Sequence, residues 1–156
     1  MRIVLDSNIL LRMRKAADPQ YPVVAAAVAA LADRGDTFCT FLQNVAEFWN
    51  VSTRPSTARG GYGMSLQEVE ATLTAIEALV AVLPDTPDVY AIWRRLVRDH
   101  GVQGVQVHDA RLAAAMLAHG LTHILTFNAD DFRRYPGIVP ITPDEAATLP
   151  PAAPVT

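Results

Sequence analysis

Short apolar runs alternate along the chain with longer segments in which apolar residues recur every three or four positions. The short runs are rich in β-branched and aromatic residues, which predicts strands. They are residues 3–5, 37–41, 81–83, 122–127 and 138–141. The longer segments have the periodicity of helices with one buried face. They are residues 8–15, 21–34, 43–54, 65 to about 80, 88–99 and 108–119, with a helical turn at 128–134 and a short helix after Thr142.

Several predicted helix ends carry capping signals. Residues 65–68 (SLQE) and 142–145 (TPDE) have the capping-box pattern, a hydroxyl residue followed three positions later by Glu. Asp18 and Thr86 each precede a proline, the arrangement of an N-cap followed by the first helical position. Gly120 follows the predicted helix 108–119 as a C-cap. These signals support helices between the strands.

Strands that alternate with helices predict a fold of the α/β class. Because each connection is long enough to carry a helix, we expect a parallel sheet of about five strands, covered on both faces. The chain has 156 residues, which is the size of one domain. We assign residues 1–149 to a single domain and the proline-rich residues 150–156 to a frayed C-terminal tail.

The composition excludes several classes of protein. A formal net charge of −3 excludes a general polycation that coats nucleic acid, so RNA binding would need a local basic patch. The single cysteine, Cys39, excludes a disulfide framework, and its apolar surroundings predict a buried, inert thiol. The N-terminus does not resemble a signal peptide, and no apolar run reaches the roughly 18 residues of a membrane span. We therefore expect a cytoplasmic protein without membrane association.

Acidic residues lie where α/β proteins carry out chemistry. Asp6 ends the first predicted strand, and ligands of parallel sheets bind at the carboxyl ends of strands. Glu47 lies on the polar stripe of the helix 43–54, and Asp109 opens the helix 108–119 on its apolar side. Residues 128–132 (NADDF) follow the fourth strand. Each feature alone is explained by helix capping, the helix dipole or solvation, so only their shared position favours a site.

Carboxylates that meet in a cleft repel one another and have raised pKa values unless a cation neutralises them. Mg2+ is the natural partner because it prefers carboxylate oxygens and keeps several waters, and Mn2+ can substitute for it. Such a site suits the metal-assisted hydrolysis of a phosphodiester.

Four segments resemble the motifs of PIN-domain nucleases in order and spacing. They are LDSNIL at 5–10, VAEFWNV at 45–51, QVHDARLA at 106–113 and LTFNADDF at 125–132. The chain length and the stretch EFWNVSTRP further resemble the VapC toxins of type II toxin–antitoxin systems. The resemblance extends from residue 2 to about residue 142. It implies a three-layer α/β/α sandwich and a magnesium-dependent endoribonuclease.

By this resemblance, Asp6, Glu47 and Asp109 are the catalytic and metal-binding triad, and Asn8 is a polar group beside it. The fourth position of the family is often Asp but is Asn128 here, which raises the question of a second metal. Asp131, in preference to Asp130, is the expected substitute. The resemblance also implies a homodimer and inhibition by a cognate VapB-type antitoxin.

Arginines near the motifs fit an RNA substrate, although each also fits an ordinary solvated surface. They are Arg12, Arg54, Arg111, Arg133 and Arg134. The sequence shows no evident aromatic platform for stacking single-stranded RNA. Trp49 and Trp93 lie on apolar helix faces, so we interpret them as core or dimer contacts.

Three other readings remain open. A haloacid-dehalogenase-like phosphatase would need an Asp where Asn8 lies, and a receiver-like signalling module would need a lysine late in the chain. Lys15 is the only lysine. The third reading is a catalytically silent PIN-fold binding protein, which Asn128 favours and the intact Asp6, Glu47 and Asp109 oppose.

Overall fold

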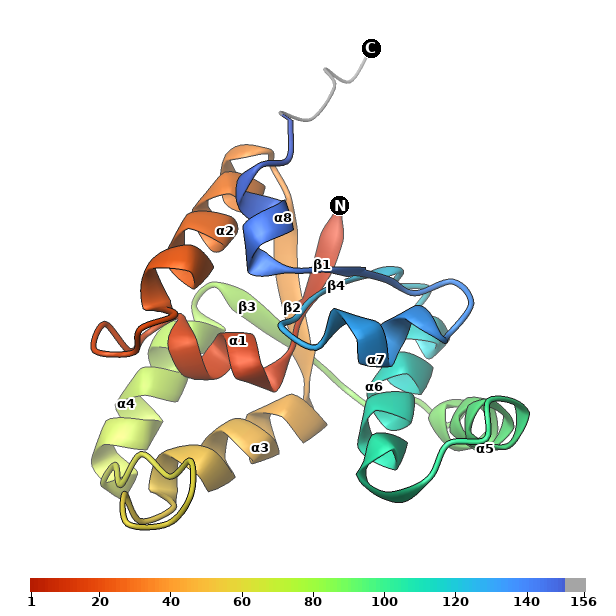
Figure 1. The fold of residues 1–156 in the computed structure, drawn as a ribbon, viewed down its shortest axis with the longest axis horizontal. Coiled ribbons are helices and arrows are strands. Elements are labelled where there is room, and N and C mark those ends of the chain that lie inside the picture. Colours follow the sequence, from red (N-terminus) through yellow and green to blue (C-terminus); the bar gives the residue numbers. More distant parts are fainter. Residues whose placement is uncertain (151–156) are drawn as a thin grey trace.

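The computed structural model describes residues 1–150 and contains a five-stranded, all-parallel sheet (Figure 1). The strands are ordered β3-β2-β1-β4-β5. Their bounds are β1 (Arg2–Leu5), β2 (Thr37–Phe41), β3 (Val80–Leu83), β4 (His123–Leu125) and β5 (Val139–Ile141). The predicted parallel sheet is confirmed. Of the predicted tail 150–156, all but Pro150 lies outside the described residues.

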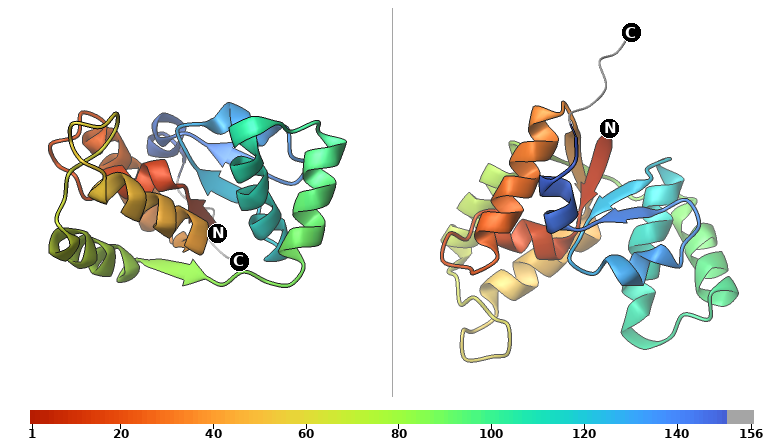
Figure 2. Two further views of the ribbon diagram at one scale, coloured as in Figure 1. Left: turned by 90° about the horizontal axis from the view of Figure 1, so that it is seen from below. Right: turned by 45° about the horizontal axis from the view of Figure 1, so that its top comes forward.

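Helices cover both faces of the sheet, which confirms the predicted three-layer α/β/α sandwich (Figure 1). One face carries α1 (Ser7–Arg12), α2 (Tyr21–Asp33), α3 (Leu42–Thr53), α4 (Leu66–Glu77) and α8 (Pro143–Ala147). The other face carries α5 (Val89–Asp99), α6 (Val107–Ala118) and α7 (Ala129–Arg133). A 3-10 turn, η1 (Gly104–Gln106), leads into α6. Figure 2 shows α5 beside α6, on the opposite side of the molecule from α2 and α4.

The central strand β1 supplies both hydrophobic cores because successive side chains of a strand point to opposite faces. Ile3 and Leu5 pack against the helices of one face, and Val4 packs against those of the other. All three side chains are completely buried. Strands buried on both faces read as continuous apolar runs, which explains the run that predicted β1.

The strand order places the topological switch point between β1 and β4. The chain goes from β1 to β2 and β3 on one side, and then crosses to β4 and β5 on the other side. Ligands of open parallel sheets bind at such a point, beyond the carboxyl ends of the strands. Asp6 follows β1 and Thr126 follows β4, so both residues lie at this place.

Both predicted capping boxes are present, with reciprocal hydrogen bonds between Ser65 and Glu68 and between Thr142 and Glu145. The two N-caps predicted before prolines are wrong. Asp18 accepts a hydrogen bond from the backbone N–H of Gln20 in the turn before α2, and Gln20 is itself the N-cap. The helix α5 likewise begins after Asp88, and the hydroxyl of Thr86 is buried without a partner in the described part of the chain.

Several element ends also differ from the prediction. The helix α4 stops at Glu77, before the predicted residue 80, because Val80 already pairs with Phe38 in the sheet. The helix α1 stops at Arg12 instead of residue 15. The strand β4 spans His123–Leu125 instead of residues 122–127, and the hydroxyl of Thr126 just beyond it donates to Asp6.

Cys39 is buried, as predicted, and burial raises the pKa of its thiol to about 11. A thiol with such a pKa is not a nucleophile at neutral pH. None of the helices within residues 1–150 is long and apolar enough to cross a membrane.

The inner strand β4 provides a test of the packing. We expect Ile124→Ala to lower the free energy of unfolding by about 2–5 kcal/mol, because the completely buried side chain of Ile124 would leave a cavity. Urea denaturation measures this change. The matched control is Val139→Ala on the edge strand β5, where the side chain is 47% exposed, and it should cost far less. Equal losses in the two variants would contradict this packing.

Candidate active site

Asp6 lies at the switch point and joins three elements. Its backbone N–H donates to the carbonyl of Leu125 at the end of β4, 3.1 Å away, and its side chain caps α1 through the N–H of Ser7 at 2.7 Å. Only 7% of Asp6 is exposed. Burial raises the pKa of its carboxyl, and hydrogen bonds from Thr126 and Ser7 partly oppose this rise. Asp6 therefore lies directly after the first strand, as predicted, and its burial is a finding of the structure.

Four hydrogen bonds hold the Asp6 carboxylate. Its Oδ1 accepts from the N–H of Ser7 and from the amide of Asn44 at 3.3 Å, and the Ser7 hydroxyl lies 3.2 Å from the same oxygen. Its Oδ2 accepts from the amide of Asn8 at 2.8 Å and the hydroxyl of Thr126 at 2.6 Å. Buried charges need such partners, because an unpaired buried carboxylate is strongly disfavoured. The donors fix the orientation of Asp6 relative to α1, α3 and β4.

Glu47 is connected to Asp6 through Ser7. The hydroxyl of Ser7 lies 2.6 Å from Oε2 of Glu47, and the amide of Gln43 lies 3.2 Å from Oε1. The same amide donates to the carbonyl of His108 at 2.9 Å, which ties α3 to the first turn of α6. Glu47 also lines an open groove of about 530 Å3 between α3 and α6. Glu47 therefore faces solvent on one side and the buried Asp6 on the other.

Asp109, in the first turn of α6, is half-buried, and the charges of three other carboxylates influence its pKa. Burial is the main cause that raises its pKa to about 6, followed by the negative charges of Asp131, Asp6 and Glu47. A pKa raised by like charges means that these groups share one electrostatic site. The four acidic side chains that the sequence singled out at the strand ends and helix starts are thus brought together.

Asp131, and not its neighbour Asp130, takes part in this cluster. The charge of Asp131 is the largest of the carboxylate influences on Asp109. Asp130 is exposed and forms an ion pair with Arg133, one turn along α7. The preference for Asp131 as the fourth acidic group therefore agrees with its placement, and its role in binding a metal stays a prediction.

Asn8 connects the start of α1 to the loop after β4. Its amide nitrogen donates to Asp6 and, at 3.3 Å, to the hydroxyl of Thr126, and its amide oxygen accepts from the N–H of Phe127. The backbone N–H of Asn128 donates to the same Thr126 hydroxyl at 3.0 Å. The side chain of Asn128 is exposed and does not cap α7. Asn8 thus lies beside the acidic cluster, whereas the amide of Asn128 faces solvent.

Sequence reasoning missed Asn44, Thr126 and Ser7. Asn44 is completely buried on α3 and lies one turn before Glu47, so its i, i+3 spacing was a usable signal. Thr126 ends the apolar run of the fourth strand just as Asp6 ends that of the first. The contact between them depends on β1 and β4 being neighbours, which the sequence does not reveal.

Two of the predicted RNA-binding arginines lie close to the acidic cluster. Arg12 donates to the carbonyl of Asn8 at 2.9 Å, and its guanidinium lies over the ring of Phe127, 5.3 Å from the centroid. Arg111 donates to the amide oxygen of Gln43 at 2.8 Å. Each arginine therefore contacts a residue, Asn8 or Gln43, that is hydrogen-bonded to a carboxylate of the cluster.

The other predicted arginines are engaged elsewhere. Arg54 donates to the carbonyl of Arg59 within its own loop, and Arg133 pairs with Asp130. Arg134 donates to the side chain of Gln106 at 3.0 Å. A role of these arginines in RNA binding stays a prediction.

The acidic cluster offers the ligand atoms that a hard divalent cation prefers, but its side chains do not surround a common point. Carboxylate oxygens are the ligands that Mg2+ and Mn2+ prefer. Over the part of the chain that the structure describes, however, no three Asp, Glu, His or Cys side chains converge closely enough to bind one ion. The Ser7 hydroxyl lies between Asp6 and Glu47 instead. Binding a metal would require these side chains to rotate toward a common point.

Solved structures of other proteins have a fold similar to that of this chain. VapBC2 from Rickettsia felis, bound to a DNA fragment from its promoter, matches with a TM-score of 0.65 and 16% identity, over 91% of this chain and 98% of that chain. VapBC-1 from nontypeable Haemophilus influenzae matches with a TM-score of 0.64 and 17% identity, over 92% and 99%. VapC20 from Mycobacterium tuberculosis, a sarcin–ricin-loop-cleaving toxin, matches with a TM-score of 0.60 and 20% identity, over 83% and 92%.

These likenesses confirm the expected fold. No curated protein is similar enough in sequence to count as a relative. The family model of the PIN domain matches residues 3–138, which covers all four acidic positions. This match also sets aside the phosphatase and receiver alternatives, and it confirms the resemblance drawn from the four motifs. The chain belongs to the PIN domain family.

Proposed function

We propose that this chain is a divalent-metal-dependent endoribonuclease that hydrolyses RNA phosphodiester bonds. The observation that carries the proposal is the position of Asp6 at the switch point of the sheet, where the Ser7 hydroxyl joins it to Glu47 at 2.6 Å. The raised pKa of Asp109, about 6, which results from burial and from the charges of Asp131, Asp6 and Glu47, agrees with it. Carboxylates that repel one another are stabilised when a cation binds between them. The switch point of a parallel sheet is the usual place for a ligand. Membership of the PIN domain family supports the assignment as a nuclease.

In this proposal Asp6, Glu47 and Asp109 hold Mg2+, or Mn2+ in its place, and Asp131 supplies the fourth carboxylate that Asn128 lacks. A bound divalent ion would polarise the phosphate and activate a water molecule. The protein's own contribution is orientation. Asn8, Asn44 and Thr126 donate hydrogen bonds to Asp6, which favour its charged form in a buried place.

We further propose that the protein is the toxin of a VapBC-type pair, a homodimer inhibited by a VapB-type antitoxin. Two of the solved structures of similar fold are VapBC complexes, and VapC20 is a toxin that cleaves the sarcin–ricin loop. The identities of 16–20% carry the fold, so the toxin role, the antitoxin and the dimer come to this chain as proposals.

A catalytically silent PIN-fold binding protein is the second candidate. Asp6 already accepts four hydrogen bonds from the protein, and no three acidic side chains converge within residues 1–150. Both observations favour a cluster that is satisfied without a metal. The cleavage test below separates the two candidates.

Cleavage of total cellular RNA tests the proposed activity. We expect the purified protein to produce discrete fragments with Mg2+ or Mn2+ and none with a chelator. Asp6→Asn and Asp109→Asn should each lower the rate by at least about a hundredfold, because each removes a charge that would bind the ion. Gel electrophoresis followed by mapping of the fragment ends measures the result.

The matched control for these variants is Asp130→Asn. Asp130 is exposed and paired with Arg133, so this variant should cleave RNA at the wild-type rate. If Asp6→Asn and Asp109→Asn were as active as Asp130→Asn, the site assignment would be wrong. If the wild-type protein cleaved nothing under any condition, the silent binding protein would be favoured.

The raised pKa values also predict how stability depends on pH. The pKa of Asp109 is about 6 in the folded protein, above the ordinary 3.8 of an aspartate in an unfolded chain, so the folded state binds more protons between these values. Stability of the metal-free protein should therefore rise as the pH falls from 7 to 5. The raised pKa of Asp6 acts in the same direction.

Thermal unfolding in the presence of a chelator measures this effect. Asp109→Asn should melt at a higher temperature than the wild-type protein at pH 7 and should respond less to pH, because it removes the charge that its neighbours disfavour. The lowered pKa of Asp36 acts only below about pH 4 and leaves this window unaffected. Identical pH dependence in the two proteins would contradict the proximity of the four carboxylates.

A further inference from the structure

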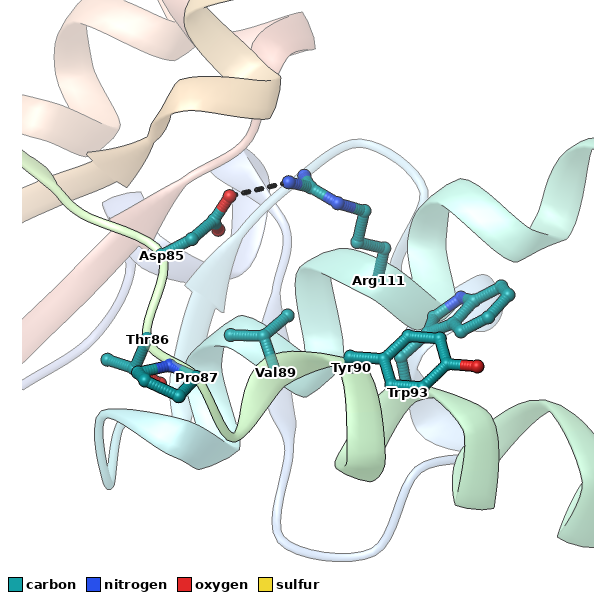
Figure 3. Close-up of a pocket in the computed structure, with 7 residues that line it drawn as sticks. All are labelled: Asp85, Thr86, Pro87, Val89, Tyr90, Trp93 and Arg111. Carbon is teal, nitrogen blue, oxygen red and sulfur yellow. Dashed lines mark hydrogen bonds and ion pairs between the residues drawn. The ribbon is translucent and has the colours of Figure 1, made fainter.

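A hollow of about 380 Å3 adjoins the acidic groove on its α5 side (Figure 3). It is lined by Asp85, Thr86, Pro87, Val89, Tyr90, Trp93 and Arg111. Its volume falls within the roughly 300–1,000 Å3 of sites for small molecules and single chemical groups. Figure 3 shows the Asp85–Arg111 ion pair above Val89, and Tyr90 and Trp93 side by side on α5.

Arg111 connects this hollow to the acidic site because it lines both the hollow and the groove that contains Glu47. A continuous series of hydrogen bonds leads from one to the other. Gln43 donates to Glu47, Arg111 donates to Gln43, and the same guanidinium donates to Asp85 at 2.7 Å. An RNA strand that lies across the acidic groove would therefore reach the hollow beside Arg111.

Tyr90 and Trp93 form an aromatic pair on the wall of the hollow. Their ring centroids are 6.2 Å apart and the rings are inclined by 32°. Trp93 is held in place because its indole N–H donates to the carbonyl of Val107 at 3.0 Å. Tyr90 is 64% exposed, which is unusual for an aromatic side chain of this size. The pair is thus a fixed ring beside an accessible one, an arrangement on which a planar group can stack.

The outer surface of α5 is basic. Arg94, Arg95 and Arg98 line a second hollow together with Tyr90, although the chain as a whole has a net charge of −3. Exposed aromatic rings beside arginines are the combination by which proteins bind single-stranded nucleic acid, since the rings stack bases and the arginines neutralise phosphates.

We infer that the hollow of α5 binds an unpaired nucleobase of the RNA substrate, which stacks on Tyr90 and Trp93 while Arg111, Arg94 and Arg95 contact the flanking phosphates. This inference rests on the proposed RNA substrate and adds a base-binding subsite to it. The sequence predicted no aromatic platform, because the hollow forms only where α5 meets Asp85 and the side chain of Arg111 from α6. Trp93, interpreted from the sequence as a core or dimer contact, is here part of the subsite wall.

Asp85 gives the subsite a distinctive test. Its carboxylate pairs with Arg111 and competes with any phosphate for that guanidinium. Asp85→Asn should therefore bind RNA several-fold more tightly than the wild-type protein. Tyr90→Ala should bind roughly tenfold more weakly, whereas Tyr90→Phe, which keeps the ring, should bind like the wild type.

Fluorescence anisotropy with a labelled single-stranded RNA, in the presence of a chelator, measures these affinities without cleavage. Leu66→Ala is the control, because Leu66 is 67% exposed on α4 and far from the hollow. Melting temperatures confirm that each variant is folded. A series of RNAs, each lacking the base at a different position, locates the stacked base. Removal of that base should abolish the difference in affinity between Tyr90→Ala and the wild-type protein, and removal of any other base should leave the difference in place.

Three results would overturn the inference. Wild-type affinity of Tyr90→Ala, together with normal RNA cleavage by the wild-type protein, would reject the subsite and leave the proposed nuclease standing. Absence of both RNA binding and cleavage by the wild-type protein would reject the two together. A shift of Tyr90→Ala from dimer to monomer in sedimentation equilibrium, with no dependence on the abasic position, would identify this face as a contact between two copies.

Discussion

The carboxylate of Asp6 is the group on which the arrangement of the molecule depends most. Moving a carboxylate out of water costs several kcal/mol even after the protein relaxes. Each hydrogen bond to a charged group returns about 1.5–3 kcal/mol, so the donors from Ser7, Asn8, Asn44 and Thr126 offset a large part of this cost. Burial still outweighs them, because the pKa of Asp6 remains raised. Their donors come from α1, α3 and the end of β4. Each of these elements must be in place before Asp6 is satisfied.

This requirement ties the fold to the site. Thr126 reaches Asp6 only because β1 and β4 are hydrogen-bonded neighbours in the order β3-β2-β1-β4-β5. Asn44 reaches it only because α3 packs across α1. The same contacts bring Glu47 and Asp109 close enough for their charges to matter. A cluster of carboxylates is unfavourable in itself, so the hydrophobic cores on either side of the sheet must hold it together.

The features that depend on local pattern were predicted correctly from the sequence. The five strands, both capping boxes and the acidic residues at strand ends follow from periodicity and capping chemistry, which act over a few residues. The sequence did not predict contacts that depend on which elements become neighbours. The spacing of Asn44 from Glu47 was a usable signal, but neither it nor the position of Thr126 shows that both side chains reach Asp6. The incorrect N-caps at Asp18 and Thr86 show that a proline nearby does not fix where a helix begins. Of the two adjacent residues, Asp130 is exposed and Asp131 lies nearer the acidic cluster, because helical spacing decides which of two adjacent side chains faces inward. The role of Asp131 as the fourth acidic group stays a prediction.

The distribution of arginines explains how an acidic protein can bind a polyanion. Several arginines near the acidic cluster are partly neutralised by the protein itself. Arg12 lies 3.7 Å from Asp18, and Arg111 pairs with Asp85. These pairs reduce the positive charge beside a site that needs its own negative charge to hold a cation. On α5, by contrast, Arg94 and Arg95 are exposed and lie one helix away from the carboxylates. If α5 binds phosphates and the acidic cluster binds a metal ion, as proposed, the exposed arginines of α5 are screened by salt. They then weaken the affinity of the cluster for a cation less than arginines inside the cluster would.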